Sequence, residues 1–148
     1  MYAKKYFETV RNASLRAEAL RDLADVTAEY AGAANGIRYD RAECGAQKNG
    51  YKSIDGILNT VARLDATRER ALDAREYALA MGAEASSVIE KALESPDADI
   101  PCLMAVYMYY IQCKDEATIA AAECVERSRI AHRKRRGLSK LEQYVPAA

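Results

Sequence analysis

The sequence predicts an all-α fold, with a long helical hairpin over residues 1–95 and a three-helix unit over residues 96–148. Three observations support this prediction. Apolar residues recur every three to four residues, as in amphipathic helices. Alanine dominates an apolar fraction of 50%, and the 148 residues include only seven Gly and three Pro. Because this apolar content is enough for a buried core, we expect one compact domain or two small units.

The first predicted helix covers residues 4–34, which contain no proline and no glycine before Gly32. Its alanines would let a partner helix approach closely. The stripe with helical spacing consists of Tyr6, Val10, Ala13, Ala17, Leu20, Ala24, Thr27 and Ala31. Glycines at positions 36, 45 and 50 then predict an irregular connection over residues 35–50, longer than most helix connections.

The second predicted helix begins near Ser53, a suitable N-cap that is followed by Asp55 in the first turn. It ends at Ser95, because the residue before Pro96 is steered out of helical geometry. Unbroken, this helix would be about 60 Å long, and the first helix is too short to cover it. We therefore expect an antiparallel hairpin that self-associates and makes the protein a homodimer.

The third predicted helix follows Asp99, with Pro101 in its first turn. It is apolar almost all round from Ile100 to Ile111, which is typical of a helix buried in a core. The remaining stretch, from Asp115 to Tyr144, forms either two helices or one continuous helix. The sequence leaves these two alternatives open.

Charge is balanced overall but strongly segregated near the C-terminus. The 22 Lys and Arg match the 22 Asp and Glu, which argues against a protein that coats nucleic acid or an anionic membrane with its whole surface. Residues 127–140 nevertheless contain seven cations and no acid. The cations are Arg127, Arg129, Arg133, Lys134, Arg135, Arg136 and Lys140. Such a run indicates a local polyanion-binding face or, alternatively, a solvated helix face that complements the helix dipole.

Residue types that commonly carry catalysis or bind metals are sparse. His132 is the single histidine, and the four cysteines, Cys44, Cys102, Cys113 and Cys124, contain no C-x-x-C pair. We therefore predict neither an enzyme nor a metal or cofactor site, and expect the cysteines to be buried thiols. With no signal peptide and no apolar run of membrane-spanning length, the sequence predicts a cytoplasmic protein without a membrane partner.

Four features follow one another without a gap between Val106 and Tyr144. An apolar-Tyr-apolar step and a polar turn precede a helix that begins Ile-Ala, and a basic helix that ends Leu-x-x-Leu comes last. The residues are Tyr110-Ile111, Gln112-Cys113-Lys114, Ile119-Ala120, and Ile130, Arg136, Leu138 and Leu141. This order resembles the C-terminal helix-turn-helix of phage proteins of the sigma-70 region-4-like group, which includes the autolysin regulatory protein ArpU family.

The resemblance implies a phage-type transcriptional regulator that binds duplex DNA through a helix-turn-helix-like C-terminal unit. It also implies that the protein engages host RNA polymerase in the cytoplasm of the host cell. A recognition helix needs cations for phosphates and long donors for base edges. The expected nucleic-acid-binding residues are Arg127, Arg129, Arg133, Lys134, Arg136 and Lys140.

Four residues depart from the family pattern. Cys124 replaces a turn glycine, Glu126 replaces an N-capping serine, and Glu123 and Arg133 occupy apolar support positions. These departures favour an alternative function from another class. In that alternative, the chain is a phage-encoded helical protein that inhibits host machinery by protein contact, with RNA polymerase or a CRISPR nuclease as its target, as an anti-CRISPR would.

Overall fold

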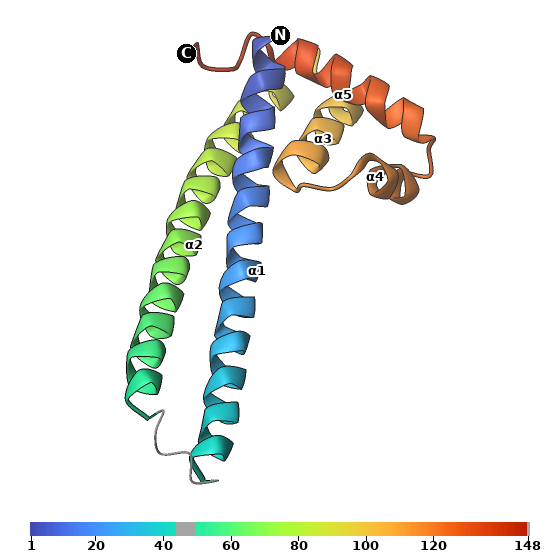
Figure 1. Cartoon of the computed structure of the whole chain (residues 1–148). Helices are drawn as coiled ribbons and strands as arrows, with labels where there is room; N and C mark the ends of the chain where they lie inside the picture. The colour runs from blue at the N-terminus through green and yellow to red at the C-terminus, as the bar shows by residue number, and fades with distance from the viewer. Residues whose placement is uncertain (44–49, 148) are drawn as a thin grey trace. The chain divides into compact units, whose positions relative to one another are not determined.

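A computed structural model describes the backbone of residues 1–43 and 50–147, and the side chains of residues 1–30, 56 and 58–147. Every element that it describes is helical, so the predicted all-α fold class is confirmed. Two long helices come first and shorter ones follow (Figure 1). The elements are α1 (Tyr2–Glu43), α2 (Gly50–Leu93), α3 (Ile100–Val106), the π-helical turn η2 (Tyr107–Ile111), α4 (Glu116–Glu123) and α5 (Arg127–Leu141).

The predicted irregular connection over residues 35–50 is wrong for its first part, because α1 continues to Glu43. An Asn-Gly pair inside a helix costs only about 1–2 kcal/mol relative to alanine, which the neighbouring helical residues offset. Residues 44–49, which include Cys44, lie outside the described part of the chain. Helix α2 begins three residues before Ser53, passes through Gly82, and ends at Leu93, two residues before Ser95.

The chain divides into two compact units whose boundary differs from the predicted one at residue 95. Unit 1 contains Met1–Arg16 and Glu76–Ala148, and unit 2 contains Ala17–Arg75. The physical reason is that the ends of the long helices share a core with the C-terminal helices. Phe7 of α1 and Ile89 of α2 belong to the same buried cluster as Leu103. The segment from α3 to α5 therefore buries apolar side chains against these ends of α1 and α2.

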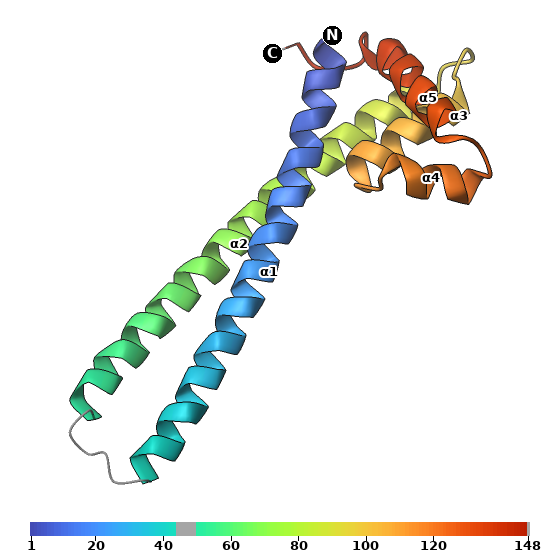
Figure 2. The same cartoon turned by 45° about the vertical axis from the view of Figure 1, so that its right-hand side comes forward.

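In unit 1, helices α3 and α5 pack very closely against each other. A Cβ added at Gly137 of α5 would lie 2.5 Å from the carbonyl oxygen of Cys102 in α3. A second, smaller cluster joins α4 to α5 through Ile119, Ala120 and Ile130. Figure 2 shows α3, α4 and α5 grouped together. These contacts fix the direction of α5 within unit 1.

In unit 2, α1 and α2 lie side by side and run in opposite directions in both views (Figures 1 and 2). Among the residues whose side chains are described in this unit, only Ala24 is buried, with an exposed fraction of 6%. Ala17 and Ala24 of α1 and Ala71 of α2 are small side chains that line the space between the two helices. Within the described part of the chain, no helix combines the length and apolarity that a membrane span requires.

Candidate nucleic-acid interface

The stretch after Asp115 forms two helices, which decides between the alternatives that the sequence left open. Helix α4 is capped by Asp115, whose carboxylate accepts a hydrogen bond from the backbone N–H of Thr118 at 2.7 Å. This is a standard N-cap. Hydrogen bonding from the Thr118 side chain, together with this bond from its backbone N–H, favours the ionised carboxylate and lowers the pKa of Asp115 below its usual value.

Cys124 ends α4 in the left-handed conformation, with φ 53° and ψ 42°. Its N–H donates to the carbonyl of Ala121 at 3.4 Å, and the N–H of Val125 donates to the carbonyl of Ala120 at 3.1 Å. This pair of bonds is the Schellman pattern, in which glycine normally occupies the left-handed position. Cys124 therefore adopts the backbone geometry that glycine normally takes at such a helix end.

Helix α5 follows Glu126, which has extended geometry but makes no side-chain cap. Its inner face holds Ile130, Leu138 and Leu141, all with exposed fractions of 3% or less. Its outer face is basic and solvent-exposed. Its exposed residues that carry a basic side chain are Arg127, Arg129, His132, Arg135 and Arg136.

Two arginines on this outer face have no charged partner. In the part of the chain that the structure describes, the side chains of Arg129 and Arg135 make no ion pair and no hydrogen bond. Arg136 lies beside them with its side chain 60% exposed, and its Nε is 3.3 Å from Oδ2 of Asp99. We call Arg129, Arg135 and Arg136 the arginine face of α5. Arg135 belongs to it, although it was not among the expected DNA contacts.

Three other residues that were expected to contact DNA already have partners within the protein. Arg127 is 73% exposed, and its Nε donates to Oε2 of Glu116 at 3.3 Å. Arg133 is largely covered and pairs with Glu123. Lys140 donates to the backbone carbonyl of Asp97 at 3.3 Å. Of these three cations, Arg127 is the most accessible to an external anion.

Lys134 was expected to contact DNA, but the structure buries it, with an exposed fraction of 9%. Its ammonium lies 2.5 Å from Oε1 of Glu116 and 3.4 Å from the ring centroid of Tyr109. Both contacts are favourable for a buried cation. The same hydrogen bond from Lys134 lowers the pKa of Glu116. Lys134 therefore joins α5 to α4 and η2, and we remove it from the proposed DNA contacts.

Helical periodicity contains the signal that separates Lys134 from Arg135. Lys134 lies four residues after Ile130 and four before Leu138, so it shares their inner face. Arg135 lies five residues after Ile130, about 140° round the helix, which places it outside. Composition alone treats both residues as members of one basic run. Their angular positions on α5 explain why Arg135 is exposed to solvent and Lys134 is buried.

Among the described residues, no three His, Cys, Asp or Glu side chains gather in a way that could hold a metal ion. Cys102 is a buried free thiol, as expected, but Cys124 is exposed, because the chain turns outward at the end of α4. Asp99 forms a hydrogen bond with the Cys102 thiol, and this bond, together with nearby Arg136, lowers the pKa of the Asp99 carboxyl. These groups support the α3–α5 contact.

Comparisons with known protein families, with curated proteins and with solved structures found no match for this chain.

Proposed function

We propose that this protein is a phage-type transcriptional regulator that binds duplex DNA by placing α5 in the major groove. The observation that carries the proposal is the arginine face of α5, where Arg129 and Arg135 have no counter-charge among the described residues. A desolvated phosphate or guanine edge is a strong partner for such a guanidinium group. The sigma-70 region-4-like resemblance adds host RNA polymerase as a proposed partner in the host cytoplasm.

The order of the basic residues along α5 supports this orientation. Recognition helices contact base edges mainly through their N-terminal residues, while flanking cations contact phosphates. Arg127 and Arg129 lie in the first turn of α5, and Arg135 and Arg136 lie two turns later. The exposed pair between Arg127 and Glu116 is worth little, so phosphate would replace it at small cost. Four arginines are thus proposed for the DNA contact.

The test compares two double variants of equal charge change by fluorescence anisotropy on a labelled random duplex of about 30 bp, long enough for several recognition-helix sites. Arg129→Ala with Arg135→Ala removes the unpaired part of the arginine face. Arg63→Ala with Arg70→Ala removes two exposed arginines from unit 2 as the control. We expect micromolar binding at low salt that weakens at least about tenfold in the first variant and little in the control.

Equal loss in both variants would show that net charge alone drives binding, and would contradict a specific role for α5. Absence of binding by the native chain at low salt would contradict the DNA-binding proposal altogether.

The second candidate function, inhibition of host machinery by protein contact, is favoured by one specific observation. Asp99, Glu116 and Glu123 pair with cations of α5, which reduces its attraction for a polyanion. A surface of mixed charge suits a matched protein partner better than a uniform phosphate backbone. If DNA binding is absent, capture of purified RNA polymerase or a CRISPR nuclease by the native chain, lost in the Arg129 and Arg135 variant, would support this function.

A further inference from the structure

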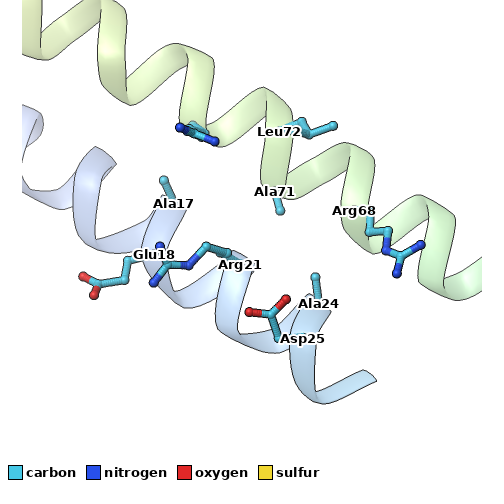
Figure 3. Close-up of a pocket in the computed structure, with 9 residues that line it drawn as sticks. Ala17, Glu18, Arg21, Ala24, Asp25, Arg68, Ala71 and Leu72 are labelled. Atoms are coloured by element: carbon cyan, nitrogen blue, oxygen red, sulfur yellow. The ribbon is translucent and has the colours of Figure 1, made fainter. Parts of the chain in front are cut away.

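We propose that a groove in unit 2 is the surface on which a second copy of this chain docks, so that two copies form an antiparallel four-helix bundle. The groove lies between α1 and α2 and has a volume of about 520 Å³. Ala17, Ala24 and Ala71 line it, and Figure 3 shows their side chains in the space between the two helices. Alanines at this position allow close approach of another helical layer.

Unit 2 by itself buries very little apolar surface. Ala24 is its single buried residue among those whose side chains are described. Leu72 lines the groove and is 58% exposed, and Val61 is 45% exposed. These two residues are eleven positions apart, about three turns, so they lie on the same side of α2. Because two helices joined by alanine contacts bury too little area to be stable alone, this side of unit 2 needs a second layer.

The charges beside the groove identify the second layer as another copy of the same unit. Glu18 and Asp25 lie on the α1 side, seven residues apart, and Arg68 and Arg75 lie on the α2 side, also seven residues apart. Seven residues are about two helical turns, so each pair faces one way. All four side chains are exposed, and none makes an ion pair within the described residues. Each copy therefore offers two free carboxylates and two free guanidinium groups.

A two-fold axis parallel to the helices matches these charges. It sets α1 of one copy against α2 of the other, and these two facing helices run antiparallel. In that register, Glu18 of one copy lies opposite Arg75 of the other, and Asp25 lies opposite Arg68. Because every contact in a two-fold interface occurs twice, the acids and arginines form four ion pairs. Arg21 already pairs with Asp22 at 3.6 Å, so its charge needs no partner across the interface.

The inference is tested by sedimentation velocity on the full chain and on charge-reversed variants. Glu18→Arg with Asp25→Arg, and separately Arg68→Glu with Arg75→Glu, should each weaken the dimer at least about tenfold, because like charges then face each other. An equimolar mixture of the two variants should form a heterodimer, since their charges become complementary. Arg63→Glu with Arg70→Glu, which changes exposed arginines that do not line the groove, is the matched control and should still dimerise.

Circular dichroism checks that each variant keeps its helix content. A native chain that stays monomeric at high micromolar concentration would overturn the inference. So would a dimer that neither reversal weakens, or two weakened variants that do not combine. The inference is independent of DNA binding, because the groove lies in unit 2 and the arginine face lies in unit 1. Failure of one proposal therefore leaves the other to be judged by its own experiment.

Discussion

Lys134 carries a positive charge in the interior of unit 1, where Glu116 and the ring of Tyr109 hold it. The guanidinium of Arg11 also lies 3.8 Å from the centroid of that ring. Residues from α1, η2, α4 and α5 thus meet at one point. The sequence predicted the basic run that contains Lys134 but not its burial, because composition carries no information on which side of the helix a cation takes.

Lys134→Met should destabilise unit 1 without removing an arginine from the outer face of α5. We expect a loss of about 1–3 kcal/mol in the free energy of unfolding, because Glu116 loses its closest cation and Tyr109 loses a cation–π contact. Urea unfolding measures this loss. Arg129→Ala, at an exposed position, should change stability by less than about 0.5 kcal/mol. Equal stability losses in the two variants would contradict the structural role of Lys134.

Gly137→Ala should lower stability by about 1–3 kcal/mol, because the added Cβ meets a backbone carbonyl of α3 that has no flexible end to move. Gly82→Ala is the matched control, since nothing lies within 4 Å of its added Cβ. The control should gain up to about 1 kcal/mol from helix propensity alone. The same unfolding experiment gives both values, and a stabilised Gly137→Ala chain would refute the close α3–α5 approach.

At the scale of elements, sequence patterns located the helices better than the connections. Pro101 correctly marked the start of α3, and Pro96 marked the end of α2 to within two residues. Asn35–Gly36 was misread as a break, because local propensity is weaker than the cooperativity of a long helix. The sequence did not decide whether the chain turns at Cys124, because cysteine has no preference for the left-handed conformation. Only the surrounding hydrogen bonds impose that conformation.

Cys124→Gly should stabilise the turn between α4 and α5 by about 1 kcal/mol, because glycine adopts φ 53° without steric cost. Cys124→Val should have the opposite effect, since a β-branched side chain tolerates this conformation poorly. Thermal unfolding of the two variants checks the difference in sign. A glycine variant less stable than the native chain would show that α4 and α5 do not turn at this residue.

Acid should weaken the connection between α4 and α5. The pKa of Glu116 is lowered in the folded chain, chiefly by its hydrogen bond with Lys134. A carboxyl with a depressed folded pKa contributes stability above its unfolded pKa and loses it as pH falls through the folded value. Unfolding free energy should therefore be level near neutrality and decline below about pH 4. Glu116→Gln should be less stable at neutral pH and should show a shallower decline, whereas an unchanged pH profile would contradict the ion pair.

At the scale of the whole molecule, the chain combines zero formal net charge with a local arginine face on which Arg129 and Arg135 make no ion pair within the described residues. The sequence predicted the segregation of basic residues near the C-terminus and the all-helical fold class. It did not predict how the chain divides, because the boundaries at Arg16 and Arg75 fall inside continuous helices. No turn residue or composition change marks such a boundary. The core that joins Phe7 to Leu103 is a tertiary contact between segments far apart in sequence.

The salt dependence of duplex binding tests the central claim most directly. Anisotropy titrations of the native chain at several salt concentrations should give a log–log slope of about −3 to −4, because four arginines of α5 would each displace close to one counterion. The Arg129→Ala, Arg135→Ala variant should reduce the magnitude of that slope by about 2. Binding whose slope is unchanged in this variant, or no binding even at low salt, would contradict a DNA-binding α5.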